Sequence, residues 1–369
     1  MRTVPLHDKL ASHGASFTER NGIEIVASVS DRETEYTFVR NSVGLTDFSY
    51  MKIYSIPEET GVDFLDDLFA GNVAKIRFGR VLHTLLADTA GTIIADCYIA
   101  NNDDEFIVLC ENIISDSELD ALFDAHGGAE AGLKDLTGDY VLLGIDGFKA
   151  WSVARELFGV DVLGLPYLSI EMYPFEEKDI HLFRAGKTSE FGYLVLAPKE
   201  NGESLFDTML TAVNKNEGGL CGNVIHNDLR LEGRFFNIFA EGKRVKDPLS
   251  LGLQWMIDFD KDTFCGCEEI KKRRDAGLTK KIIGVKTTAG LDAFAPGTPV
   301  YNGKDRVATL EAACNSPILG CSVGLALFDI DFAYSGLSFR FGSPEGTEVQ
   351  TISMPPIMPK SLTVKLDEL

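Results

Sequence analysis

One carboxylate stands inside a run of apolar residues that has the length of a β-strand. Residues 90–99 read AGTIIADCYI, and Asp96 is the only charged residue among them. Burial of an unpaired carboxylate is costly, so an acid kept in such a run is a candidate for proton transfer or for stabilising a developing charge. Alternatively, Asp96 faces water from an edge strand, because alternate residues of a strand point to opposite faces. The sequence leaves both interpretations open.

Other patterns that could carry chemistry are incomplete. Gly186-Lys187-Thr188 is similar to the end of a phosphate-binding loop, but His181 stands where such a loop needs its first glycine. The chain has no Gly-x-Gly-x-x-Gly after a strand and no Gly-x-Ser-x-Gly elbow. Nucleotide binding and serine-hydrolase chemistry are therefore without support.

The cysteines and histidines do not form a metal-binding pattern. Of the seven cysteines only Cys265 and Cys267 are close in sequence, and no second Cys or His cluster lies at ligand spacing. We predict reduced thiols and no metal site. Most histidines lack visible partners, and we interpret these as structural or surface residues: His7, His13, His83, His126 and His181.

The composition limits the classes of partner that the chain could bind. The 369 residues carry a formal net charge of -21, with a pI near 4.7, and such a field repels nucleic acids and anionic membrane surfaces. Residues 1–14 contain no apolar core of signal-peptide length, and the longest apolar stretch, near 318–328, is interrupted by glycine. We therefore predict a cytoplasmic chain with neither nucleic acid nor membrane as its partner.

Short strands and a few amphipathic helices must position these side chains. Strand-like runs lie at 52–56, 92–100, 105–110 and 140–145. Apolar residues at helical spacing predict one helix after Pro57 that stops near Gly71, and a second from Ala150 that ends at Gly159. This mixture predicts an α+β body rather than a doubly wound parallel sheet.

A polar, basic run at residues 271–281 marks a domain junction. It is short, lacks interleaved aromatic residues and lies in an acidic chain, so we interpret it as a solvated linker rather than a nucleic-acid patch. Beyond it, strand-length apolar runs are separated by turn residues. We predict a body at 1–270, formed by two interwoven subdomains, and a small C-terminal β-barrel or sandwich domain at 282–369.

Several segments, in order, resemble one family. Residues 39–51 read VRNSVGLTDFSYM and are similar to Val-Arg-x-x-Ala-Gly-Leu-Phe-Asp-Val-Ser-His-Met, while 90–98 resemble Gly-Gly-x-x-Asp-Asp-Leu-x-Val. Residues 186–193, GKTSEFGY, resemble Gly-Tyr-Thr-Gly-Glu-x-Gly-Tyr/Phe, and 226–233, HNDLRLEG, resemble Arg-Asp-x-Leu-Arg-Leu-Glu-Ala-Gly. Shorter matches follow at 247–249, 264–266 and 316–320. These are motifs of the aminomethyltransferase family, typified by the T-protein of the glycine cleavage system.

The resemblance implies an α+β, aminomethyltransferase-like folate-binding body with a C-terminal β-barrel domain. It also implies roles for three charged residues. Asp96 matches the catalytic acid beside the reactive folate nitrogens. Glu190 matches the acid that accepts hydrogen bonds from the amino group and ring N–H of the pterin. Arg230 would bind a carboxylate of folate or substrate, or would form an internal ion pair with Glu232.

The same resemblance places further residues at the ligand pocket. Lys187 and His226 stand where the family has Tyr and Arg, and both could neutralise an anionic donor, so we predict that they bind substrate. Tyr50, which replaces a His, is a third candidate for this role. Tyr98 and Tyr193 are candidates for lining an aromatic pocket around the pterin, with ordinary core packing as the alternative for all three tyrosines. Ala95 replaces the first acid of the family's Asp pair.

The predicted function follows from the resemblance. We expect an enzyme that moves a one-carbon unit from a small N-, S- or O-methylated donor to tetrahydrofolate. One alternative is the T-protein itself, with a lipoyl carrier protein as its partner. Another is a non-catalytic folate-binding protein of the iron–sulfur-assembly type, but its Lys-Gly-Cys-Tyr-x-Gly-Gln-Glu segment does not occur here.

Overall fold

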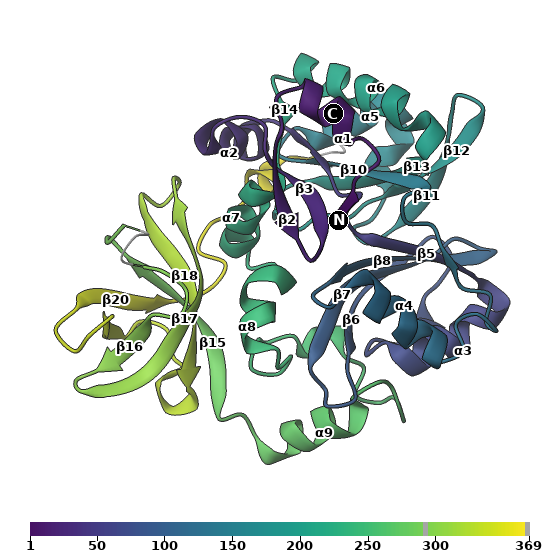
Figure 1. Cartoon of the computed structure of the whole chain (residues 1–369). Coiled ribbons are helices and arrows are strands. Elements are labelled where there is room, and N and C mark those ends of the chain that lie inside the picture. The colour runs from purple at the N-terminus through teal and green to yellow at the C-terminus, as the bar shows by residue number, and fades with distance from the viewer. Residues whose placement is uncertain (291–293, 366–369) are drawn as a thin grey trace.

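The computed structural model describes residues 1–290 and 294–365. Figure 1 shows a body that contains two large sheets and, beside it, a separate barrel. No helix in this part of the chain is long and apolar enough to cross a membrane. The mixed α+β class and the barrel are as predicted.

The first large sheet carries Asp96. Its strand order is β6-β7-β8-β5-β9, with the bounds Val81–Ala87 (β6), Ile93–Asn101 (β7), Glu105–Asn112 (β8), Lys52–Pro57 (β5) and Lys134–Asp135 (β9). One face packs on α3 (Glu58–Leu68) and α4 (Asp116–Ala125) through residues such as Cys97 and Ile99. Because side chains alternate along a strand, Asp96 and Tyr98 point to the opposite face, toward the interior of the body.

The second large sheet has the order β11-β12-β13-β10-β4-β14. Its strands are Ile170–Phe175 (β11), Lys178–Phe183 (β12), Gly192–Pro198 (β13), Tyr140–Asp146 (β10), Gly44–Asp47 (β4) and Gly219–Leu220 (β14). The helices α5 (Ala150–Phe158) and α6 (Gly202–Lys215) cover it (Figure 1). As predicted, α5 ends at Gly159, whose φ of 91° suits a residue without a side chain.

Three further helices and a small sheet complete the body. The small sheet has the order β1-β3-β2. These elements are β1 (Arg2–Thr3), α1 (His7–Ser12), β2 (Ser16–Arg20), β3 (Ile23–Ser28), α2 (Arg32–Asn41) and α7 (Asn223–Gly233). The helix α7 contacts β3 of the body and β17 of the barrel. It therefore lies where several parts of the molecule meet.

The C-terminal unit is a closed barrel with the strand order β15-β18-β17-β16-β19-β20. Its strands are β15 (Lys280–Thr287), β16 (Pro299–Asn302), β17 (Asp305–Ser316), β18 (Cys321–Asp329), β19 (Ser338–Phe341) and β20 (Thr347–Ile352). After β20 the chain returns to the body and forms a short 3-10 turn, η8 (Lys360–Thr363). We call residues 353–365 the C-terminal segment.

The basic run at 271–281 is not a linker. Its first part belongs to helix α9 (Cys267–Ala276), and its end begins β15. Helix α9 has glutamates in its first turn and arginines in its last, which complements the helix dipole. Lys and Arg are good helix formers, so residues 271–276, which carry no large apolar side chain, form the solvated end of a helix that stops before Gly277. The domain bounds 1–270 and 282–369 stay a prediction.

Shorter elements connect these units. They are η1 (Val73–Lys75), η2 (Val160–Gly164), η3 (Lys199–Asn201), the π-helical turn η4 (Ile238–Gly242), α8 (Lys243–Val245), η5 (Gln254–Met256) and η7 (Ile330–Phe332).

Candidate functional site

Two buried acids face each other across neighbouring strands. Asp96 is 1% exposed, and its strand β7 lies between β6 and β8, so the edge-strand interpretation is wrong. Glu111 of β8 is its direct cross-strand partner and is also 1% exposed. Like charges directly opposite each other destabilise a sheet. Two buried carboxylates at this place therefore require counter-charges.

Lys187 and Arg230 supply these counter-charges. The Lys187 Nζ lies 2.5 Å from Asp96 Oδ2 and 2.7 Å from Glu111 Oε2. The Arg230 guanidinium donates two hydrogen bonds to Glu111, at 2.9 and 2.7 Å. We call these four residues the ionic cluster.

The cluster keeps both acids ionised. Burial alone would raise the pKa of Asp96, but Lys187 and His83 lower it below its usual value. Burial would likewise raise the pKa of Glu111, but Arg230 and Lys187 hold it well below its usual range. Asp96 is thus an anion in the interior of the body, with one oxygen paired to Lys187 and the other to His83.

His83 is a direct partner of Asp96, so its interpretation as an isolated structural histidine was wrong. Its Nε2 lies 2.6 Å from Asp96 Oδ1, and the side chain is buried. Burial lowers the pKa of His83, so the neutral ring donates this hydrogen bond. The ring also contacts Tyr98, its cross-strand partner, and Trp255, with centroid distances of 4.6 and 5.2 Å.

Sequence reasoning also missed Glu111, although a signal for it exists. The runs at 92–100 and 105–110 are separated by a short polar turn. A hairpin built on that turn pairs Asn101 with Phe106 and, five residues further, Asp96 with Glu111. Once a hairpin is assumed, the register of its two strands therefore places Asp96 opposite Glu111.

A small cavity adjoins the ionic cluster. Its volume is about 20 Å³. Two buried polar atoms in its wall, the Tyr98 hydroxyl and Arg230 Nε, have no hydrogen bond of good geometry among the described residues, although the Tyr167 hydroxyl lies near that of Tyr98. The residues that line this central cavity are Phe48, Met51, Tyr98, Asp146, Gly186, Lys187, Leu194, His226 and Arg230.

Most of the predicted pocket residues lie at this cavity. His226 and Arg230 are four residues apart on α7 and so share a face of the helix. Lys187 comes from the loop between β12 and β13, and no helix follows it as a phosphate-binding loop would require. Tyr98 lies on β7, two residues after Asp96. The structure thus brings Asp96 together with four of the predicted residues.

Three details differ from the prediction. Arg230 pairs with Glu111 and not with Glu232, because residues two apart on a helix point in different directions. Burial, together with Arg230, lowers the pKa of His226 to about 3, so His226 is neutral and cannot neutralise an anionic donor. Its Nε2 is hydrogen-bonded to Thr46 at 2.9 Å. Lys187 is already paired with two acids of the chain itself.

The remaining predicted residues lie outside the cavity wall. Tyr50 donates a hydrogen bond of 2.6 Å to Glu111 and so contacts the ionic cluster without lining the cavity. Tyr193 is buried under the Arg184 guanidinium, which lies 4.5 Å from its ring centroid.

Glu190 belongs to a second buried cluster. Its carboxylate accepts hydrogen bonds from the Ser361 hydroxyl at 2.6 Å and from the Ser361 backbone N–H at 2.9 Å. Nearby, Glu232 is bound by Arg40 at 2.9 Å and by Tyr36 and Ser316 at 2.8 and 2.5 Å. We call this group the closed cluster: Tyr36, Arg40, Glu190, Glu232, Ser316 and Ser361.

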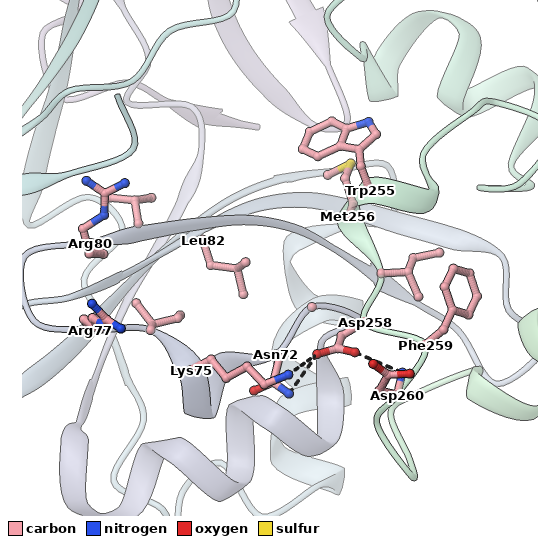
Figure 2. Close-up of a pocket in the computed structure, with 14 residues that line it drawn as sticks. Asn72, Lys75, Arg77, Arg80, Leu82, Trp255, Met256, Asp258, Phe259 and Asp260 are labelled. Carbon is pink, nitrogen blue, oxygen red and sulfur yellow. Dashed lines mark hydrogen bonds and ion pairs between the residues drawn. The ribbon is translucent and has the colours of Figure 1, made fainter. Parts of the chain in front are cut away.

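A much larger hollow opens on the surface near β6. It has a volume of about 800 Å³, and Figure 2 shows Arg77 and Arg80 on one side of it and Trp255 on another. Asp258 is held there by Lys75 at 2.9 Å and by Asn72 at 3.0 Å. Because Trp255 also contacts His83, it stands between this outer hollow and the His83–Asp96 pair.

The thiols and acids of the described residues are not arranged as a metal site. In the part of the chain that the structure describes, no three His, Cys, Asp or Glu side chains are grouped to hold an ion. All seven cysteines are free, and five of them are buried.

An α+β body with a buried ionic cluster, joined to a closed barrel, defines the class of fold. The profile of the family described as GCVT N-terminal domain matches residues 6–261, which is more than half of the chain. The chain belongs to this family.

Individual relatives agree with this assignment. An aminomethyltransferase of Bacillus pumilus is 25% identical over 344 residues, covering 91% of this chain and 93% of that protein. One of Mycobacterium avium is 27% identical over 334 residues, covering 89% and 88%. The crystal structure of the glycine cleavage system aminomethyltransferase T from Bartonella henselae has a TM-score of 0.82 at 18% identity, covering 97% of this chain and 98% of that one. The predicted family and fold class are confirmed, and the predicted enzyme class, a one-carbon transferase that uses tetrahydrofolate, agrees with these relatives.

Proposed function

We propose that this chain is an enzyme that transfers a one-carbon unit from a small methylated donor to tetrahydrofolate. The observation that carries the proposal is the central cavity. It combines an ionised acid in its adjoining cluster with two buried polar groups that lack a hydrogen bond of good geometry. Unpartnered buried groups are costly, and a polar ligand that pairs with them would recover that cost. The amino, oxo and ring N–H groups of a reduced pterin fit this wall.

Asp96 is the predicted catalytic residue. When bound, tetrahydrofolate supplies the amine that receives the one-carbon unit. As the N–C bond forms, the bond from the carbon to the N, S or O atom of the donor breaks, and that atom leaves with the electron pair. The Asp96 carboxylate can accept the proton that the amine loses, and neutral His83 fixes the orientation of the carboxylate through its 2.6 Å hydrogen bond. Arg230 and Tyr98 would hold the ring system in place, and this positioning would contribute a large part of the rate enhancement.

Folate must displace part of the cavity wall. The cavity of about 20 Å³ is far below the roughly 300–1,000 Å³ of small-molecule sites. Lys187 is the part of the wall most able to move, because its long side chain comes from a loop and not from a strand or helix. We therefore propose that the Lys187 ammonium leaves its place between Asp96 and Glu111 when folate enters.

The charges of the site indicate which charge the methylated donor should carry. Once the Lys187 ammonium has left, Arg230 is the one cation of the ionic cluster that still faces the carboxylates of Asp96 and Glu111, and His226 is neutral. The site thus favours an uncharged or cationic methylated donor over an anionic one. Glu190 and Tyr193 stay predicted cofactor-binding residues and Tyr50 a predicted substrate-binding residue, and a cytoplasmic location stays part of the proposal.

The second candidate is aminomethyl transfer from a lipoyl carrier protein. The relatives favour it, because they are named aminomethyltransferases. Those names also favour an enzyme over a non-catalytic folate-binding protein.

The test is a direct assay. The protein is incubated with tetrahydrofolate and, separately, with methylated amines, thioethers, sulfonium compounds, aryl ethers or an aminomethylated lipoyl carrier protein. Formation of 5-methyltetrahydrofolate or of methylenetetrahydrofolate identifies the unit that is transferred. Absence of saturable tetrahydrofolate binding in calorimetry would overturn the proposal whatever the donor.

A further inference from the structure

A second large pocket opens between the body and the barrel. Helices α7 and α8 lie on this side of the body (Figure 1), and the end of β2, the turn after it and the barrel strand β17 also line the pocket. We call it the barrel-side pocket. Its volume is about 700 Å³, and small-molecule sites measure roughly 300–1,000 Å³. The pocket is therefore large enough for a small organic ligand.

Arg20 lines this pocket without a counter-ion. Its guanidinium lies over two aromatic rings, 4.3 Å from the centroid of Phe239 and 5.2 Å from that of Tyr50. Such a position is stabilised by cation–π attraction, which uses none of the five N–H donors of the group. Within residues 1–290 and 294–365, the side chain makes no hydrogen bond and no ion pair. Its donors are therefore available to a ligand.

The acids of the pocket wall are engaged elsewhere. Glu311 is paired with Arg244 at 2.7 Å. Glu19 accepts a backbone N–H of its own turn at 2.5 Å, and Glu241 accepts one of its own helical turn at 3.0 Å. A ligand that approaches Arg20 thus meets a guanidinium to which no acid of the wall is paired. An arginine in this condition is suited to bind a carboxylate through two parallel hydrogen bonds.

Arg20 also connects the barrel-side pocket with the ionic cluster. A narrow cavity of about 10 Å³ is lined by Arg20, Tyr50 and Glu111 together, and the Tyr50 hydroxyl donates a hydrogen bond of 2.6 Å to Glu111. Phe239 lines both this narrow cavity and the barrel-side pocket. The stack of Arg20 on the two rings therefore stands between the pocket and the two acids of the cluster.

We propose that the barrel-side pocket binds the methylated donor and that Arg20 binds a carboxylate of that donor. This inference rests on the proposed function. As the guanidinium turns toward the carboxylate, the rings of Tyr50 and Phe239 become free for a methylated ammonium or sulfonium group, which aromatic rings bind by cation–π attraction. The donor is thus a zwitterion, with a cationic methylated end toward the ionic cluster and a carboxylate at Arg20. Tyr50 takes the substrate-binding role predicted for it.

A cationic methylated end also suits the transfer. When the methyl carbon bonds to the folate amine, its bond to the donor N or S atom breaks, and the electron pair stays on that atom. The donor end becomes a neutral amine or thioether, and the proton of the folate amine passes to Asp96. No anionic leaving group has to form beside the two acids of the cluster.

The first experiment measures donor binding without folate. Short trimethylammonio and dimethylsulfonio acids are titrated into the protein by calorimetry, each beside its primary amide. The wild type should bind the acids at least about tenfold more tightly than the amides, because only the acids offer Arg20 a charged acceptor. In Arg20→Gln this preference should fall below about threefold. Arg20→Lys should keep part of it, since the charge remains but the two-bond geometry is lost.

Arg77→Gln is the matched control. Arg77 lines the outer hollow, and its guanidinium also has no partner among the described residues. Loss of this second unpaired arginine should leave the preference for acids unchanged. Thermal unfolding checks that all variants fold. An equal loss of preference in Arg77→Gln would show that the acids respond to the net charge of the chain and not to Arg20.

The second experiment adds tetrahydrofolate and follows 5-methyltetrahydrofolate. For the acids, Arg20→Gln should raise KM about tenfold or more and change kcat by less than about threefold, because Arg20 binds the part of the donor that does not react. For the amides, neither constant should change. A general disturbance of the fold would affect acids and amides alike.

The outcomes separate this inference from the proposed function. If the wild type binds acids and amides equally, or binds neither, the role of Arg20 is overturned whatever the result with folate. If the acids bind through Arg20 but tetrahydrofolate does not bind, the proposed function is overturned and the carboxylate site remains. If tetrahydrofolate binds but only an aminomethylated lipoyl carrier protein supplies the one-carbon unit, the donor role of the barrel-side pocket is overturned.

Discussion

The two buried clusters of the body differ in what they adjoin. The closed cluster connects α2 and α7 with the barrel strand β17 and the C-terminal segment, and the acceptor sites of its acids are filled by donors of the chain. The ionic cluster balances its charges equally well, but one side of it faces a cavity with unpaired polar groups. Burial of charge is thus common to both clusters. The unfilled hydrogen bonds distinguish them.

One loop joins both clusters. Lys187 and Glu190 are three residues apart in the segment between β12 and β13, yet Lys187 reaches the ionic cluster and Glu190 the closed cluster. Thr188 lies between them and bonds Asp146. A movement of Lys187 on folate binding would therefore act on a loop that the C-terminal segment holds at its other end.

The largest difference between the clusters should appear in turnover. Asp96→Asn keeps the shape of the side chain but removes the proton acceptor, so the rate of one-carbon transfer should fall about 10²–10⁴-fold with little change in folate affinity. Glu232→Gln is the matched control, since it alters an equally buried acid of the closed cluster. Steady-state rates and calorimetry measure both effects. Wild-type turnover in Asp96→Asn, or an equal loss in Glu232→Gln, would remove the functional distinction between the clusters.

The next effect concerns stability. Lys187→Met leaves Asp96 and Glu111 with one cation too few, and loss of one partner from a buried ion pair costs about 3–5 kcal/mol. The folded-state pKa values of both acids are lowered, so the stabilisation from pairing is present at neutral pH and is lost as the pH falls through those values. The cost of the variant should shrink accordingly in acid.

Urea unfolding from pH 7 downward measures this cost. Lys149→Met provides the control, because the exposed pair of Lys149 with Glu217 should contribute less than about 1 kcal/mol. Equal losses in the two lysine variants would show that the ionic cluster is not maintained by Lys187.

Much of this fold could be predicted from local sequence. The strands around Asp96 and the helix that ends at Gly159 follow from apolar periodicity and from a glycine stop. The helix α9 could not be found in this way, because it buries little beyond Cys267 and Ile270 and lacks an apolar stripe. A solvated helix and a polar linker have the same composition.

Residues around the cavity could be picked out where a single motif marks them and were missed where strand pairing places them. Asp96 stands out in its own strand, but Glu111 and His83 become visible only through the register of neighbouring strands. Lys360 and Ser361, which donate to Glu190, lie 170 and 171 residues away in the C-terminal segment. No local pattern reports such a contact, and so a family motif alone could not show that this acid is already occupied.

The third effect is a pH dependence of stability that belongs to Asp146. A carboxyl group whose folded-state pKa is raised from 3.8 to about 7 stabilises the fold only while it is protonated. Stability is therefore lost as the pH rises between these two values, by as much as about 4 kcal/mol. Asp146→Asn stays neutral and should become more stable than the wild type by an amount that grows from pH 4 to pH 7. Urea unfolding across this range measures the difference, and a constant difference would show that Asp146 is already well solvated.

The smallest effect tests whether the closed cluster is purely structural. Ser361→Ala removes the 2.6 Å hydrogen bond to Glu190 and the acceptor of the Phe191 N–H, which should cost about 1–3 kcal/mol. Thr363→Ala is the control, because that exposed hydroxyl only bonds within its own turn and should cost less than about 0.5 kcal/mol.

Urea unfolding measures the loss of stability in each variant. Calorimetry with tetrahydrofolate then shows whether Ser361→Ala also changes folate affinity. If the closed cluster only joins the C-terminal segment to the body, Ser361→Ala lowers stability and leaves folate affinity unchanged. A tighter complex in Ser361→Ala would instead mean that the segment competes with the ligand for Glu190. Both clusters would then take part in binding, and the loop that carries Lys187 and Glu190 would couple them.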